Sequence, residues 1–212
     1  MAFVGKKFPN LNVDAMNEMG DTFKVNVLEE ALNNKKKVVL FWYPKDFTFV
    51  CPTELHAFEA AKAEFAKRNT IVIGASCDTP EVHFAWLSTA KDNGGIEGVT
   101  YPILADSNRN LSSTLGILDI SNEQYNEETG VVTVDGDNVT YRATYIIDEE
   151  GVVQHESINN MPLGRNVSEY LRIIDALTHV QEKGEVCPAN WEEGKDAMQA
   201  TLKGTAEYLS SH

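Results

Sequence analysis

The residues around Cys51 form a pattern in which a thiol could do chemistry. An apolar run, 38–43, ends at Pro44, a short loop follows, and Cys51 directly precedes Pro52. Proline is favoured in the first turn of a helix, so we expect Cys51 to stand at a helix start. A thiol there meets free backbone N–H groups and the positive end of the helix dipole. Both favour the thiolate, which is the reactive form of cysteine.

The other two of the three cysteines determine the fate of an oxidised Cys51. A reactive thiolate oxidises to a sulfenic acid, and a second cysteine can condense with that acid to form a disulfide. Cys187 is the candidate, because it lies in the run 184–191, outside regular structure, where a chain can move. Cys77 is the weaker candidate, since it ends an apolar strand and buried cysteine usually behaves as a small inert hydrophobe. An odd, sparse set without a CxxC motif makes neither a disulfide scaffold nor a four-cysteine zinc site.

Polar and ring side chains could assist the thiolate. Thr48 lies one turn ahead and can place its hydroxyl beside the sulfur, and Pro44 can shield the sulfur from bulk water. An arginine from elsewhere would stabilise the thiolate and hold a polar substrate by its fork of donors. Spacing alone leaves the choice open among Arg68, Arg109, Arg142, Arg165 and Arg172.

The histidines contribute no recognisable site. We interpret four of them, which match no metal-ligand spacing, as packing or surface residues: His56, His83, His155 and His179. No histidine is placed by a motif to act as the base of a cysteine hydrolase.

The elements that must position Cys51 alternate between strand and helix. Residues 38–43 and 70–75 are continuously apolar and β-rich, which predicts buried strands, and residues 52–68 have a helical apolar face. This βαβ unit implies parallel pairing and a right-handed crossover. The remaining expected elements are helices at about 78–90, 108–115, 167–184 and (weakly) 195–209, a strand at 101–104, and hairpins joining 131–134 to 139–141 and 144–148 to 152–155.

This order predicts a three-layer α/β fold with a central mixed sheet, and it resembles thioredoxin. Residues 1–165 would form the thioredoxin-like domain, and residues 166–212 a C-terminal helix and extension that carries Cys187 and is continuous with the same domain. Trp42 and Trp86 are expected in the core, and Trp191 is expected to anchor the segment around Cys187.

Composition narrows the functional classes. The chain has 212 residues, with 18 basic and 32 acidic side chains, hence a formal charge of −14, which disfavours non-specific binding to nucleic acid or anionic lipid. No segment approaches the roughly 18 consecutive apolar residues of a membrane span. The first residues lack the apolar stretch of a secretory signal, which predicts a cytoplasmic location. With no Rossmann glycine fingerprint and no phosphate loop, the sequence predicts no cofactor.

The two cysteine segments carry a family resemblance. Pro44, Thr48 and Cys51 match the PxxxTxxC motif of peroxiredoxins, and residues 186–191 match the second-cysteine motif of the typical two-cysteine class. The chain resembles this family over about residues 3–210 and is similar to the bacterial alkyl hydroperoxide reductase C type. The resemblance implies an antioxidant thiol peroxidase that reduces hydrogen peroxide and organic hydroperoxides.

The resemblance also implies roles for individual residues. Cys51 would be the peroxidatic thiolate, Thr48 would hydrogen-bond the peroxide and the sulfur, and Pro44 would cover the pocket. Arg142 aligns with the active-site arginine of the family, so that Pro44, Thr48 and Arg142 would bind substrate. Glu54 would orient that arginine, with a second arginine, Arg165, behind it.

The implied partners are a second copy of the chain and an external reductant. Cys187 of the partner subunit would resolve the sulfenic acid, which implies an obligate homodimer, and the family often assembles dimers into decamers. Electrons would come from thioredoxin, from a dedicated flavoprotein reductase or from another dithiol protein.

Two other functions remain as alternatives. A thioredoxin-like disulfide reductase would reduce insulin, but the missing CxxC argues against it. An oligomeric holdase chaperone would suppress aggregation even in Cys51→Ser, and nothing in the sequence requires it.

One segment departs from the family pattern. Residues 122–138 are longer than the corresponding loop of most relatives. They form either an added hairpin at a subunit edge or a segment that borders the active site.

A second departure from the family pattern predicts that Cys51 resists over-oxidation. Members that over-oxidise readily carry a Gly-Gly-Leu-Gly loop and a C-terminal Tyr-Phe, where this chain has 94–97 as Gly-Gly-Ile-Glu and 208–209 as Tyr-Leu. We expect the tail to pack less firmly over the Cys51 helix, so that local unfolding is faster and disulfide formation outcompetes sulfinic acid formation. The measurement is the sulfinic fraction of Cys51 per turnover at high peroxide. Accumulation as fast as in a sensitive relative would contradict the expectation.

Overall fold

The computed structural model describes residues 2–212, except for the side chains of residues 121 and 122. The chain divides into two compact units, residues 1–165 and 166–212. Among the described residues, no helix is both long enough and apolar enough to cross a lipid bilayer.

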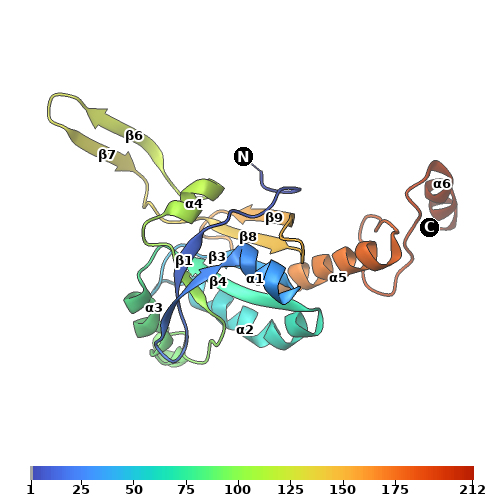
Figure 1. Ribbon diagram of the computed structural model, residues 1–212, viewed down its shortest axis with the longest axis horizontal. Helices are drawn as coiled ribbons and strands as arrows, with labels where there is room; N and C mark the ends of the chain where they lie inside the picture. The colour runs from blue at the N-terminus through green and yellow to red at the C-terminus, as the bar shows by residue number, and fades with distance from the viewer. Residues whose placement is uncertain (1) are drawn as a thin grey trace. The chain divides into compact units, whose positions relative to one another are not determined.

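A seven-stranded mixed sheet forms the centre of the first unit (Figure 1). Its strand order is β2-β1-β5-β4-β3-β8-β9. The strands are β1 (Asn12–Met16), β2 (Thr22–Asn26), β3 (Lys37–Trp42), β4 (Thr70–Ser76), β5 (Ile103–Ala105), β8 (Arg142–Ile147) and β9 (Val153–Asn159). The helices of this unit are α1 (Val27–Asn34), α2 (Cys51–Lys67), α3 (Pro80–Leu87), α4 (Asn110–Leu115) and a 3₁₀ turn η1 (Lys91–Asn93).

The predicted βαβ unit is confirmed. β3 pairs with β4 in parallel, from Lys37 opposite Thr70 to Trp42 opposite Ala75, and α2 connects them. β3 is flanked on its other side by the antiparallel β8, which continues into the predicted hairpin with β9. The sheet is therefore mixed, as the sequence predicts, whereas β1, β2 and α1 lie outside the elements predicted from the sequence.

Successive side chains of β3 point to opposite faces of the sheet, and each face packs into its own core. Leu40 and Trp42 join an apolar cluster that also contains Ala31 of α1 and Leu111 of α4. Phe41, between them, faces the opposite side of the sheet, where its ring stacks on Phe58 of α2 with centroids 3.9 Å apart. Such an aromatic pair stabilises the fold by more than its buried apolar area alone would predict. The middle of α2 is thus fixed to the sheet by this packing.

The predicted hairpin between 131–134 and 139–141 is wrong. β7 (Val131–Asp135) instead pairs with β6 (Ser121–Asn126), and this second sheet projects from the first unit in Figure 1. The reversal lies at 126–130: the Asn126 side chain accepts hydrogen bonds from the N–H groups of Glu128 and Thr129, and Gly130 has a positive φ of 68°. Asn and Gly suit such a turn, and this signal prevails over the polar run 135–138.

The second unit contains α5 (Val167–Lys183) and α6 (Leu202–Ser211). α5 ends at Gly184 as predicted, with φ of 65° at that glycine. The terminal helix begins later than predicted, because the Thr201 side chain caps it by accepting from the N–H of Gly204. Helix α3 is likewise shorter than the predicted 78–90.

Candidate active site

Cys51 is the first residue of α2, and its side chain is 1% exposed. The N-cap position is Val50, whose apolar side chain cannot accept a hydrogen bond, and Pro52 follows within the first turn. Pro52 has no N–H, and the N–H groups of Thr53 and Glu54 donate to the carbonyl of Val50 at 3.1 and 3.4 Å. This turn therefore offers an anion the positive end of the helix dipole rather than a set of free donors.

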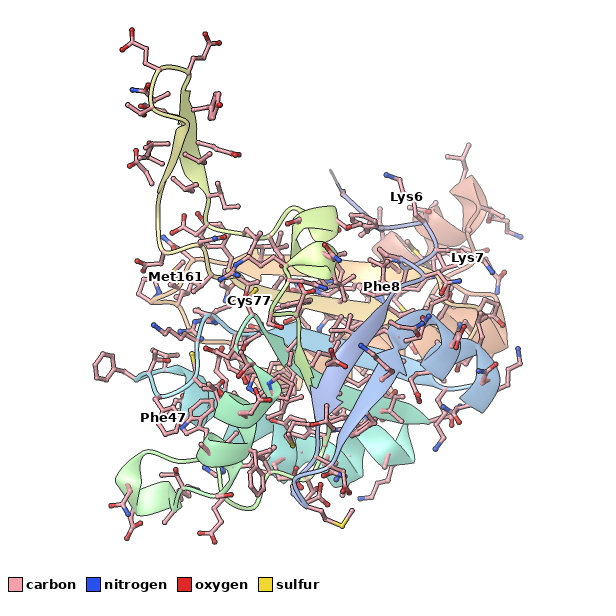
Figure 2. The ribbon with its side chains drawn as sticks, turned by 60° about the vertical axis from the view of Figure 1, so that its left-hand side comes forward. Lys6, Lys7, Phe8, Phe47, Cys77 and Met161 are labelled. Carbon is pink, nitrogen blue, oxygen red and sulfur yellow. The ribbon has the colours of Figure 1, made fainter. Side chains whose placement is uncertain are left out.

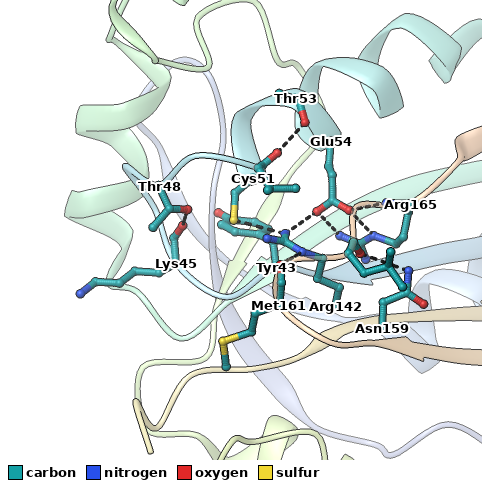
Figure 3. A network of polar contacts seen from close by, with 12 residues as sticks. Tyr43, Lys45, Thr48, Cys51, Thr53, Glu54, Arg142, Asn159, Met161 and Arg165 are labelled. Atoms are coloured by element: carbon teal, nitrogen blue, oxygen red, sulfur yellow. Dashed lines mark hydrogen bonds and ion pairs between the residues drawn. The ribbon is translucent and has the colours of Figure 1, made fainter.

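Arg142 is the arginine that the fold brings to Cys51. Its Nη1 lies 3.4 Å from Sγ of Cys51, and its Nε donates to the carbonyl of Met161 at 2.6 Å (Figure 3). Arg142 opens β8, the antiparallel neighbour of β3, so the sheet itself sets the position of the guanidinium beside the start of α2.

Glu54, one turn into α2, holds that guanidinium in place. Its Oε2 accepts from Nη1 of Arg142 at 2.7 Å, and the Glu54 side chain is only 3% exposed. Because Cys51 and Glu54 are three residues apart on one helix, they lie on the same side of its first turn. One guanidinium nitrogen thus meets both the sulfur and the carboxylate.

Arg165 closes the network behind Glu54. Its Nε and backbone N–H donate to Oε1 of Glu54, each at 2.9 Å, and its Nη2 lies 2.8 Å from Oε2. The Arg165 guanidinium carbon also lies 5.1 Å from the ring centroid of Phe41 and 5.8 Å from that of Phe58. A desolvated cation over aromatic faces is stabilised electrostatically, which makes the arginine part of the core as well as of the site.

These contacts leave a charge to be balanced. Two buried guanidiniums and one carboxylate carry a formal charge of 2 − 1 = +1. The anion closest to this charge would be the thiolate of Cys51. Buried charges are tolerated when paired, so the cluster can accept one further anion beside Arg142.

The loop between β3 and α2 is anchored from below by a buried polar cluster. The Tyr43 hydroxyl donates to Oδ1 of Asp46 at 2.7 Å, and Nδ1 of His83 lies 2.7 Å from Oδ2 of the same carboxylate. Burial raises the pKa of Asp46 and, more strongly, the pKa of Tyr43. The interpretation of His83 as a packing residue is consistent with its complete burial.

Thr48 and Pro44 lie in this loop and line the same cavity as Cys51. Pro44 is buried. The Thr48 hydroxyl donates to the carbonyl of Lys45 at 2.8 Å, which fixes the loop (Figure 3). Both side chains therefore stand where a molecule approaching the sulfur would meet them.

The cavity above Cys51 has a volume of about 520 Å³ and includes residues that the motifs do not name. Four of them come from outside the Cys51 loop: Asp137, Val139, Met161 and Pro162. For Asp137, the sequence contains one indication. The length of residues 122–138 predicts either a hairpin at a subunit edge or a segment that borders the active site, and Asp137 lies in that segment.

Cys187 and Cys77 lie in different surroundings. Cys187 belongs to the second unit, where its Sγ is 3.7 Å from the carbonyl of Ala176 in α5, and partial burial raises its pKa. The expected anchoring is seen in Trp191, which is buried and accepts from Arg172 at its backbone carbonyl. Cys77 is buried after β4, and burial raises its pKa to about 11.

The described residues hold no cluster of three or more His, Cys, Asp or Glu side chains placed to bind a metal ion.

Comparison with protein families gives two matches. Residues 4–156 match the AhpC/TSA family, and residues 176–211 match the C-terminal domain of 1-Cys peroxiredoxin.

Similar proteins are found in several organisms. Alkyl hydroperoxide reductase C of Helicobacter pylori is 43% identical over 178 residues, covering 84% of this chain and 82% of that protein. Peroxiredoxin-2 of Bos taurus is 40% identical over 211 residues, covering 100% and 96%. The solved structure of reduced Plasmodium vivax 2-Cys peroxiredoxin superimposes with a TM-score of 0.87 at 37% identity, covering 99% of this chain and all of the other.

The buried carboxylate yields a first prediction from this geometry. Glu54→Gln should slow oxidation of Cys51 by roughly ten- to a hundredfold, since a hydrogen bond to a charged group contributes about 1.5–3 kcal/mol. It should also lower the free energy of unfolding by about 3–5 kcal/mol, because it leaves two buried guanidiniums without their anion. Stopped-flow oxidation and urea unfolding measure the two effects. The matched control is Glu81→Gln, an exposed first-turn acid of α3, and equal behaviour of the two variants would contradict the assignment.

The raised pKa of Cys77 predicts its inertness. With a pKa of about 11, Cys77 is mainly the thiol at pH 8, and its thiolate fraction, hence its alkylation rate, should rise about tenfold per pH unit up to pH 10. At pH 8, iodoacetamide labelling followed by peptide mass spectrometry should show much slower modification of Cys77 in the folded protein than in urea. Labelling of the folded protein at the unfolded rate would refute the burial of this thiol.

Proposed function

The chain belongs to the AhpC/TSA family, the peroxiredoxins, and we propose that Cys51 is the residue with which it reduces hydroperoxides. The protein is a thiol peroxidase with a thioredoxin-like fold. The observation that carries the assignment to Cys51 is the 3.4 Å contact between its sulfur and Arg142, whose guanidinium is held by Glu54.

The first step is attack by the Cys51 thiolate on one oxygen of the peroxide. A sulfur–oxygen bond forms, the oxygen–oxygen bond breaks, and the leaving oxygen takes up a proton to become water or an alcohol. Cys51 becomes a sulfenic acid. Arg142 would hold the peroxide and stabilise the charge on the departing oxygen, while Thr48 and Pro44 shape the approach.

The second step joins Cys51 to Cys187. The Cys187 sulfur attacks the sulfenic sulfur, a disulfide forms, and the oxygen leaves as water. Cys51 is 1% exposed, so the first turn of α2 must open before this attack. Opening this turn would break the hydrogen bond from the Thr53 hydroxyl to the carbonyl of Val50, at 2.6 Å, but no cap bond from the apolar Val50 side chain. An external dithiol protein would then return two electrons to the disulfide.

We further propose that Cys187 comes from a partner subunit in a homodimer, and that dimers assemble into decamers. The family resemblance supports this arrangement. So does the exposure of two aromatic side chains in the Cys51 loop, which a subunit contact would cover: Phe47 is 54% and Phe49 96% exposed. The cytoplasmic location stays a prediction, which cell fractionation would test.

The alternatives carry less support. A disulfide reductase would need a paired dithiol, and the position three residues after Cys51 is Glu54, which is bound to two arginines. No described contact favours a holdase as the main activity.

The two cysteine variants test the assignment. Cys51→Ser should abolish peroxidase activity, because no thiolate remains beside Arg142. Cys187→Ser should undergo one stoichiometric oxidation and then stop without a cross-linked dimer. Non-reducing electrophoresis after one equivalent of hydrogen peroxide, together with peroxide consumption, measures both. Cys77→Ser is the control that should keep turnover and cross-linking, and full activity in the first two variants would overturn the proposal.

A further inference from the structure

The hairpin β6–β7 reaches the active-site cavity with the end at which it joins the rest of the first unit. Asp137 and Val139 follow directly after β7, and both line the cavity above Cys51. Met161 lines the same cavity, and Figure 2 shows it near the base of the projecting hairpin. The insertion therefore adds wall to the place where Cys51 meets its substrate.

Hydrogen bonds fix this end of the hairpin, which we call the stem (residues 117–119 and 136–141). The carbonyl of Val139 accepts from the N–H of Asp119 at 2.8 Å, and the carbonyl of Asn138 accepts from Nε of Arg109 at 3.0 Å. The Thr140 hydroxyl donates to the carbonyl of Tyr43 at 3.0 Å. Tyr43 immediately precedes the Cys51 loop, so the stem and the loop share a common support.

Gly136 permits the close approach within the stem. Its φ is +95°, and a Cβ added there would lie 2.5 Å from the carbonyl oxygen of Asp119. Any other residue would strain the turn or push the two stem strands apart. The position of Asp137, the next residue, thus follows from packed backbone.

The cavity wall has a mixed character that suits a particular substrate. Its volume of about 520 Å³ lies within the ~300–1,000 Å³ of small-molecule sites and far exceeds the ~30 Å³ occupied by a water-sized molecule. Val139, Met161 and Pro162 supply apolar surface beside the sulfur. Asp137 is exposed and places a negative charge on the wall, while Lys45 supplies a positive one.

We propose that the stem selects the hydroperoxide: Val139 packs against the hydrocarbon part of an uncharged alkyl or aryl hydroperoxide, and Asp137 disfavours one that carries a carboxylate. This inference rests on the proposed function of Cys51 and adds to it the substrate class and two residues that determine specificity. The tip of the hairpin, from Tyr125 to Val132, is exposed and does not line the cavity, so selectivity resides in the stem.

The test compares cumene hydroperoxide with its para-carboxylate, which differ by one charge, and uses hydrogen peroxide as a third substrate. Asp137→Asn should raise the ratio of kcat/KM for the carboxylate over cumene hydroperoxide about threefold, an effect of the size expected for exposed charges several ångströms apart. Lys45→Gln should lower the same ratio. Both changes should shrink at high salt, because salt screens exposed charges.

Val139→Thr keeps the side-chain volume and removes apolar surface. It should lower kcat/KM for cumene hydroperoxide relative to hydrogen peroxide about two- to fivefold, the cost of losing one buried methyl contact. The matched control shortens the tip by replacing residues 125–132 with Asn-Gly, which joins the paired residues Gln124 and Thr133 and leaves the stem intact. This control should keep both ratios of the unmodified protein.

The outcomes separate the two proposals. If the unmodified protein reduces all three substrates but Asp137→Asn, Lys45→Gln and Val139→Thr leave both ratios unchanged, the stem does not select substrate and the inference is wrong. If tip shortening changes the ratios as much as the stem variants do, selectivity is not a property of the stem. If the unmodified protein reduces none of the substrates, the failure is that of the proposed function.

Discussion

The geometry around Cys51 depends on a carboxylate shared between two buried guanidiniums. Glu54 receives Arg142 on one side and Arg165 on the other, and all three side chains are less than 5% exposed. Without the carboxylate, two cations would lie buried together, and the guanidinium next to the sulfur would have no fixed orientation. With it, Nη1 of Arg142 is held 3.4 Å from the sulfur of Cys51, so the residual positive charge of the cluster lies beside that sulfur.

In the proposed reaction, the start of α2 must first hold the Cys51 sulfur and then release it to Cys187. Arg142, Glu54 and the packing of Phe58 hold α2 in place. The first turn, by contrast, starts at an apolar cap and begins with a sulfur that is covered in the folded state. The proposed release requires only this turn to unwind while the middle of α2 stays packed on the sheet, as is common for segments that move during function.

Much of the fold and site could be predicted from the sequence, for identifiable reasons. The apolar runs of β3 and β4 and the hairpin β8–β9 carry strong local signals, and the structure confirms them. The motif placed Thr48, Pro44 and Cys51 in one loop, which the structure brings around one cavity. The pairing of β6 with β7 was missed because these strands are exposed and lack the alternation that a buried face imposes.

Long-range contacts were accessible only through the resemblance. Nothing local indicates that Arg142, 91 residues away, meets Cys51, since strand order determines that meeting. No family motif predicts that His83 contacts Asp46. None predicts that Asp137 lines the cavity. Such contacts arise where separate elements converge, and a single sequence does not record their distances.

The stacking of Arg165 on Phe41 and Phe58 ties reactivity to the interior of the protein. These two rings are both part of the hydrophobic packing and the surface against which the Arg165 guanidinium lies while it binds Glu54. A substitution that changes the shape of either ring would therefore also move Arg165 and the Glu54 carboxylate that it binds. Changes of length and sequence are better tolerated in the exposed hairpin β6–β7. Lengthening a surface connection costs little conformational entropy and leaves the central sheet and its helices unchanged.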